Sequence, residues 1–351
     1  MRSAFAKNEP GWLRIKAAVC KAVHVDENPR APMTLLSRYK GNSEKKQGCR
    51  VLNLRPGDVV EVRSEEKIRS MLDANESLDG LPFMPEMKKY CGRRFRVLTR
   101  VDRAVIEGIG NRRMQNTVIL EGATCDGFAH GDCERTCRIL WKEDWLRRVD
   151  HKAPNPVSDF PRDLPKEVSK EDCFGRALSC QLTSLPDASY RLPASFEDVV
   201  RQYVCSQNFA RSGIPRHACD FMLRLNFKVQ RFLGRKRYAS LYGKLRKTPS
   251  VSLRLQPGEL VEVKSKEEIL ETLDIRGRNR GLSLTYDMLK YCSRRFRVMR
   301  RVDQMISERT KKMRRMSDTV ILEGVTCDGS DAWNCPRKCY CLWREIWLKR
   351  V

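Results

Sequence analysis

An internal repeat limits the possible folds of this chain most strongly, because a stretch of eleven residues occurs twice. Residues 117–127 read Thr-Val-Ile-Leu-Glu-Gly-Ala-Thr-Cys-Asp-Gly, and residues 319–329 differ from them only by Val in place of Ala. Residues 93–97, Arg-Arg-Phe-Arg-Val, are repeated without change at 294–298. The sequence therefore predicts two copies of one unit of about 100 residues, both with the same fold.

The repeat and the stretches between its copies divide the chain into four parts. Trp12, Ile15, Val19 and Val23 have the spacing of the apolar face of a short helix. A proline-rich stretch follows the first copy, and residues 221–247 contain no acidic side chain. The predicted parts are an N-terminal helix and linker at 1–48, a first repeat at 49–150, a proline-rich linker with a basic helical segment at 151–248, and a second repeat at 249–351.

Each repeat is expected to be mainly β-structure with short helical insertions. Residues 59–63 and 116–124 are rich in β-branched and apolar side chains, which favours strands. Residues 94–106 are expected to form one long or bent strand. Ser265 and Glu268 have the spacing of a capping box, so a short helix should begin there. About five strands in each copy predict a small barrel.

A resemblance to known proteins agrees with this expectation. Residues 54–62 read Leu-x-Pro-Gly-Asp-x-Val-x-Val, and residues 92–97 read Gly-Arg-Arg-Phe-Arg-Val. This pattern resembles the start of SH3-like small barrels of the nitrile hydratase β-subunit type and of the KOW-type nucleic-acid-binding barrels. The wider pattern, Tyr-Cys, Leu-Glu-Gly, Cys-Asp-Gly and Trp-x-Glu-x-Trp-Leu-x-Arg-Val, resembles an uncharacterised bacterial Cys-rich repeat family with no established activity. The resemblance implies a tandem repeat of two SH3-like β-barrels, joined by helical and linker segments.

Four cysteines occur at matching positions in both copies, which indicates metal ligation. Thiolates are preferred ligands of Zn²⁺, and four of them complete a tetrahedral structural site. The predicted ligands are Cys91, Cys125, Cys133 and Cys137 in the first copy, and Cys292, Cys327, Cys335 and Cys339 in the second. We therefore expect two zinc sites. Two alternatives stay open, namely iron–sulfur clusters, which use the same ligands, and buried free thiols that serve as small apolar residues.

Other cysteines and histidines carry weaker signals. His130 lies between two predicted ligands but corresponds to Ala332 in the second copy, so we expect it to be an exposed loop residue. Cys341 occurs only in the second copy and is either a spare thiol or a substitute ligand. A third site in the linker is a further hypothesis, with candidate ligands Cys173, Cys180, Cys205, Cys219 and His217.

The formal net charge of +25 favours an anionic partner, with nucleic acid as the first expectation and an acidic membrane surface or an acidic protein as alternatives. The basic run at 311–315 extends the cationic surface. Phe95 and Phe296 either stack on bases or belong to the core. The candidate nucleic-acid-binding residues are Arg93, Arg94, Arg96, Arg294, Arg295, Arg297, Arg235, Lys236 and Arg237.

Catalytic motifs are missing from the sequence, which has no Gly-rich phosphate loop and no His-Glu-x-x-His pattern. Glu143 and Glu345 are expected on solvated faces, in ion pairs with arginines.

The sequence has no N-terminal apolar signal and no long apolar run, so we expect a cytoplasmic protein. The overall prediction is a non-catalytic, metal-stabilised protein that binds an anionic partner. Its alternatives are an iron–sulfur redox protein, a peripheral membrane protein and an assembly scaffold.

Overall fold

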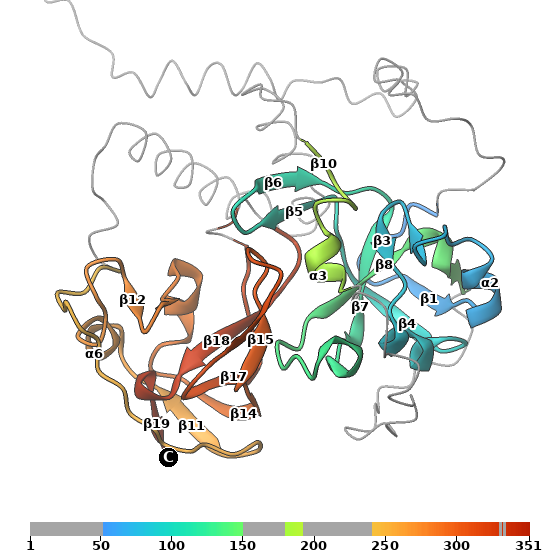
Figure 1. Cartoon of the computed structure of the whole chain (residues 1–351). Coiled ribbons are helices and arrows are strands. Elements are labelled where there is room, and N and C mark those ends of the chain that lie inside the picture. The colour runs from blue at the N-terminus through green and yellow to red at the C-terminus, as the bar shows by residue number, and fades with distance from the viewer. Residues whose placement is uncertain (1–51, 150–179, 192–240, 330–331, 333–334) are drawn as a thin grey trace, which may run out of the picture. The chain divides into compact units, whose positions relative to one another are not determined.

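The computed structural model describes residues 52–149, 180–191, 241–329, 332 and 335–351, all within the compact unit of residues 50–351. Each copy of the repeat contains a curled five-stranded antiparallel sheet, and the strand order is the same in both (Figure 1). This confirms the mainly β class and the two-fold repeat. No helix in the described part is long and apolar enough to cross a membrane. Several predictions concern residues outside the described ranges, namely the N-terminal helix, Cys173, Cys205, Cys219, His217, Arg235, Lys236 and Arg237.

The sheet of the first copy has the strand order β8-β7-β4-β1-β9. Its last strand, β9, follows a 3₁₀ helix and returns to pair with the first strand, β1. The elements in chain order are β1 (Val59–Val62), α2 (Glu65–Arg69), β2 (Ser77–Leu78), β3 (Leu81–Pro82), the 3₁₀ helix η2 (Pro85–Tyr90), β4 (Arg94–Arg100), β5 (Arg103–Ile106), β6 (Gly110–Arg113), β7 (Thr117–Thr124), η3 (Phe128–His130), β8 (Arg138–Lys142), η4 (Glu143–Trp145) and β9 (Leu146–Arg148).

The second copy repeats this arrangement with the order β18-β17-β14-β11-β19. As the capping-box spacing predicted, the Ser265 hydroxyl accepts from the Glu268 amide, and the Glu268 carboxylate accepts from the Ser265 amide. The elements are β11 (Leu260–Val263), α6 (Lys266–Leu270), β12 (Arg278–Asn279), β13 (Leu282–Ser283), η7 (Tyr286–Tyr291), β14 (Arg295–Arg301), β15 (Gln304–Ile306), β16 (Met313–Arg315), β17 (Thr319–Thr326), β18 (Tyr340–Arg344), η8 (Glu345–Trp347) and β19 (Leu348–Arg350).

The expectation of one strand over residues 94–106 was wrong. The chain leaves the sheet after Arg100, and residues 103–106 form a separate hairpin, β5–β6. The amide of Val101 donates to the Thr117 carbonyl at 2.8 Å, and the amide of Met114 donates to the Asp102 carbonyl at 2.9 Å. These two bonds close the base of the hairpin, so the direction of the chain changes between β4 and β5.

Aromatic side chains fill the core of each copy. Trp141 and Trp145 are fully buried and pack edge to face, with 6.4 Å between ring centroids. Tyr90 packs in the same manner on Phe95, which is 2 % exposed. Edge-to-face pairs add to the stabilisation that burial of the rings provides. Phe95 is therefore a core residue, which decides between the two roles considered for it.

Glu143 is buried and not on a solvated face, which corrects the expectation from the sequence. Its carboxylate forms an ion pair with Arg100, as expected, but it also accepts hydrogen bonds from the amides of Asn53 and Leu54 at 3.0 and 2.8 Å. Glu345 has the same role in the second copy and is fully buried as well. The two carboxylates hold the segment that leads into each sheet, because buried amides need acceptors.

The two copies exchange equivalent hydrogen bonds. The Ile306 amide of β15 donates to the sulfur of Cys133 at 3.3 Å, and the Val105 amide of β5 donates to the sulfur of Cys335 at 3.4 Å. A further contact between the copies has no equivalent in the opposite direction. The carboxylate of Glu134 in the first copy accepts from the Gln304 amide of the second copy at 3.1 Å. Two of the predicted metal ligands are therefore also hydrogen-bond acceptors for the other copy.

Candidate metal centre

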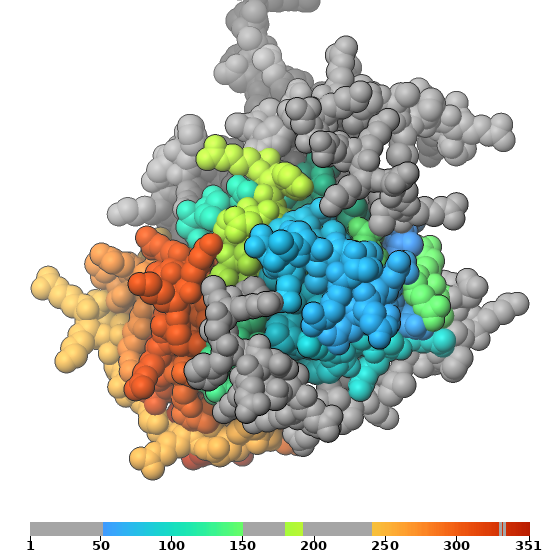
Figure 2. Space-filling model, turned by 45° about the vertical axis from the view of Figure 1, so that its right-hand side comes forward, coloured from blue at the N-terminus to red at the C-terminus, as the bar shows by residue number. Residues whose placement is uncertain are grey.

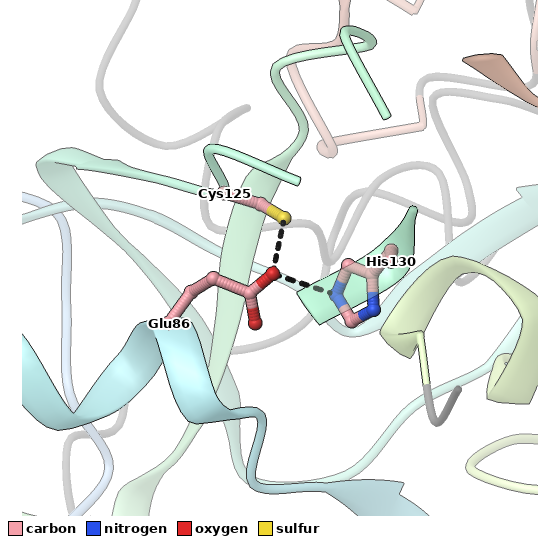
Figure 3. Close-up of side chains that lie close together, drawn as sticks. All are labelled: Glu86, Cys125 and His130. Atoms are coloured by element: carbon pink, nitrogen blue, oxygen red, sulfur yellow. Dashed lines mark hydrogen bonds and ion pairs between the residues drawn. The ribbon is translucent and has the colours of Figure 1, made fainter. Parts of the chain in front are cut away.

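A buried cluster of three possible metal ligands lies in the first copy. It consists of Glu86 on η2, Cys125 directly after β7, and His130 at the end of η3 (Figure 3). The Glu86 Oε1 atom lies 3.9 Å from the Cys125 sulfur and 3.2 Å from His130 Nε2. All three ligand atoms lie within 4.8 Å of one another, so one ion could contact all of them after small adjustments of the side chains.

The loop between β7 and β8 brings Cys125 and His130 together. The Cys125 amide donates to the Cys137 carbonyl at 2.8 Å, which closes the base of the loop. Gly127 has a φ of 81°, and a Cβ atom there would lie 1.8 Å from the Cys133 carbonyl oxygen, so no other residue fits. Glu86 is joined to this loop because its Oε1 atom accepts from the Ala129 amide at 3.0 Å.

Three polar atoms of the cluster lack a hydrogen-bond partner within the described part of the chain. Both ring nitrogens of His130 and the Oε2 atom of Glu86 are buried without a hydrogen bond. His130 is 1 % exposed and Glu86 is 3 % exposed. A buried polar group without a partner costs about 1–3 kcal/mol, and coordination of a cation would remove that cost. The expectation that His130 is an exposed loop residue was therefore wrong.

Burial also affects the thiol of the cluster. It raises the pKa of Cys125 well above its ordinary value, and the nearby charge of Glu86 acts in the same direction. The thiol is therefore protonated in the metal-free protein at neutral pH. Metal ligation requires the thiolate, so binding at this cluster would release a proton.

A cavity of about 40 Å³ adjoins the cluster. This volume exceeds the roughly 10–15 Å³ that one water molecule requires. Its walls combine thiols with cationic side chains, among them Arg135 and Arg337. The cysteines that line it are Cys125, Cys133, Cys137, Cys180 and Cys339.

Of the four predicted ligands in the first copy, three line this cavity and one does not. Cys91 caps the C-terminal end of η2, and burial followed by the charge of Glu65 raises the pKa of its thiol to about 11. Among the described residues, the group of three or more ligand atoms within 4.8 Å of one another is Glu86, Cys125 and His130, and neither predicted set of four cysteines forms such a group. The two four-cysteine sites therefore remain predictions.

In the second copy the corresponding residues differ in chemistry. Asp287, which is buried, takes the place of Glu86, and Ala332 takes the place of His130. A hydrogen bond from the Cys327 thiol and the charge of Arg337 lower the pKa of Cys339. Burial and the charge of Asp287 raise the pKa of Cys341. The charge of Asp287 thus acts on Cys327 and Cys341, and the second copy contains no histidine.

Most of the arginines predicted to bind nucleic acid in the first copy form contacts with other residues of that copy. Arg94 lies 3.5 Å from the carboxylate of Glu61, and Arg96 donates to the Gly57 carbonyl. Arg93 is exposed.

The equivalent arginines of the second copy behave in the same way. Arg295 pairs with Glu262 at 3.2 Å, and Arg297 donates to the Gly258 carbonyl. The Arg294 guanidinium lies 5.8 Å from the centroid of the Phe296 ring. The repeated Arg-Arg-Phe-Arg-Val motif is thus explained in large part by contacts within each copy.

Sequence reasoning missed Glu86 and misjudged His130. An acidic residue occurs at the position of Glu86 in both copies, where the second copy has Asp287, and that was the available signal. His130 had no such signal, because the second copy has no histidine at the equivalent position.

The fold and the candidate metal centre define the class to which the chain belongs: a mainly β tandem repeat with a buried Glu–Cys–His cluster that could hold a metal. No protein family, curated protein or solved structure matches the chain.

Proposed function

We propose that this protein is a metal-stabilised, non-catalytic binder of nucleic acid. The observation that carries the proposal is the hairpin β15–β16, with exposed Lys311, Lys312, Arg314 and Arg315. None of these four side chains forms an ion pair with a described residue. Cations held so close together repel each other in the free protein, and the phosphates of a nucleic acid would neutralise them.

A comparison with the first copy supports this role for the hairpin. Arg112 occupies the position of Arg314, but its guanidinium donates to the Ser189 hydroxyl at 2.8 Å and to the Pro186 carbonyl at 3.0 Å. Arg112 is therefore held by internal contacts in the first hairpin, whereas its counterpart Arg314 is exposed in the second. We expect binding to depend mainly on the second copy.

The fold proposed for each copy is an SH3-like barrel. The support is the strand order, in which four strands form a meander and the fifth pairs with the first after a 3₁₀ helix.

For the metal we propose zinc, because Glu86, Cys125 and His130 supply oxygen, sulfur and nitrogen, all of which Zn²⁺ accepts. An iron–sulfur cluster relies on cysteine ligands, and the mixed donors favour it less.

Fluorescence anisotropy with labelled single-stranded RNA over a range of salt concentrations tests nucleic-acid binding. The triple variant K311E, K312E and R314E should bind more weakly, with a salt slope flatter by about one unit per lost phosphate contact. The matched control carries the same charge change at Arg254, Arg276 and Arg278, which are also exposed. Equal weakening in both variants would show that net charge alone attracts RNA. Binding to acidic vesicles without binding to RNA or DNA would replace this proposal with a membrane partner.

A further inference from the structure

We propose that Cys180, from the segment between the two copies, is the fourth ligand of the metal held by Glu86, Cys125 and His130. This inference rests on the metal binding proposed above and adds a residue that the repeat itself does not contain. Its consequence is that the metal ties the inter-copy segment to the first copy.

The position of Cys180 is fixed by the residue that follows it. The Gln181 side chain is buried, its Oε1 atom accepts from the Leu140 amide at 2.9 Å, and its Nε2 atom donates to the Leu140 carbonyl at 2.9 Å. Nε2 also donates to the carbonyl of Pro82 at 3.1 Å. The carboxamide thus bonds both the amide and the carbonyl of a β8 residue, as the backbone of a neighbouring strand would. Since Gln181 follows Cys180 directly, these bonds hold Cys180 against the first copy.

The rest of the segment is anchored as well. Leu182 and Leu185 belong to the same hydrophobic core as the first sheet. The strand β10 (Tyr190–Arg191) pairs with β6. In Figure 2, residues 180–191, in yellow-green, lie against the blue and teal atoms of the first copy. Cys180 is therefore held in place by contacts on its C-terminal side before any metal binds.

Cys180 faces the same cavity as Cys125 and His130. It is 6 % exposed. Burial raises the pKa of its thiol, while the backbone amides of Leu182 and Thr183 lower it.

The cluster needs one more donor, since Zn²⁺ in structural sites is almost always four-coordinate. Cys133 is less suited because its sulfur lies toward the second copy, 3.3 Å from the Ile306 amide. Cys137 lines the same cavity but is only half-buried, so it is less shielded from solvent than a ligand of a buried ion would be. Cys180, by contrast, is buried on the cavity wall that it shares with Cys125 and His130. Its sulfur lies outside the group of atoms within 4.8 Å of one another, so its side chain would turn toward the ion on binding.

Cobalt substitution in the full-length protein provides the test. Co²⁺ replaces Zn²⁺ in tetrahedral sites, and thiolate ligands give it charge-transfer absorption in the near ultraviolet. We compare the wild type with C125A, C180A and C91A, the last being a thiol of the first copy outside the cavity. Because the proposed site has two thiolates, C180A and C125A should each lose about half of the charge-transfer absorption of this site. The absorption of C91A should equal that of the wild type.

The possible failures can be told apart. A wild-type protein without cobalt absorption overturns the metal binding itself. Loss in C125A together with no change in C180A overturns the role of Cys180 alone. Loss in C91A instead of C180A supports the four-cysteine site predicted from the sequence and also overturns the inference.

Thiol labelling of the wild type covers the case in which C180A does not fold. Metal-loaded and chelator-treated protein are treated with N-ethylmaleimide under mildly denaturing conditions, because the thiols of Cys125 and Cys180 are buried in the folded protein, and the products are analysed by peptide mass spectrometry. Cys180 and Cys125 should gain label after chelation, whereas Cys91 should label equally in both samples. Equal labelling of Cys180 in the two samples overturns the inference.

Discussion

The carboxylate of Glu345 lies 2.7 Å from the guanidinium of Arg301 and is fully buried. Glu143 forms the same pair with Arg100 in the first copy. Each carboxylate also accepts backbone amides from the segment that precedes its sheet. The repeated pair therefore connects the closing 3₁₀ helix, the strand that carries the arginine and the entry of the chain.

Removal of this carboxylate should destabilise the copy that contains it. E143A would remove the ion-pair partner of Arg100 and the acceptor of the buried Leu54 amide, and loss of one partner of a buried pair costs about 3–5 kcal/mol. Urea unfolding measures the change in free energy. The control E121A removes an exposed carboxylate and should change stability by less than about 0.5 kcal/mol. Equal stability of the two variants would contradict the structural role of Glu143.

Truncation of Phe95 should act on stability rather than on RNA binding alone. The ring is buried and packs on Tyr90 at a centroid distance of 5.7 Å. F95A should therefore cost about 3–5 kcal/mol, measured by thermal and urea unfolding. F296A, at a half-buried ring, should cost less. An F95A variant that melts like the wild type but binds RNA weakly would assign the ring to base stacking.

Alkaline pH should destabilise the metal-free protein through Cys91. Burial, with a smaller contribution from Glu65, raises the pKa of this thiol from 9.0 to about 11, against the opposing effect of Lys88. The folded state therefore binds more protons than the unfolded state between these values, and stability falls as pH rises through that window. Urea unfolding at several pH values should show a shallower decline for C91A than for the wild type. Identical slopes would show that the thiol titrates equally in both states.

The contact between the copies should depend on Glu134. Its Oε2 atom accepts from the amides of Asp303 and Gln304 at 2.6 and 3.1 Å. Hydrogen bonds to a charged acceptor contribute about 1.5–3 kcal/mol, so E134A should lower the unfolding free energy by an amount in or below that range. E107A, an exposed carboxylate of the β5–β6 hairpin, is the matched control. Indistinguishable unfolding curves for the two variants would contradict a stabilising contact.

The sequence by itself determined the duplication, the mainly β class and the helix start at Ser265. These features depend on local patterns, which are the alternation of apolar residues, β-branched runs and the spacing of capping residues. The duplication made the patterns easier to read, because each was present twice. The break after Arg100 escaped this reasoning, since the apolar residues Phe95, Val97, Val101 and Val105 continue on both sides of it.

Only the tertiary structure decided which side chains form the candidate metal centre. Glu86, Cys125 and His130 come from two elements and the loop between two strands, and Cys180 comes from a segment outside the repeat. Their proximity depends on how η2, the β7–β8 loop and residues 180–191 pack together, and no spacing along the chain encodes that packing. The same reason applies to the arginines of Arg-Arg-Phe-Arg-Val. Their charge is visible in the sequence, but the partners Glu61 and Glu262 that bind Arg94 and Arg295 become neighbours through strand pairing alone.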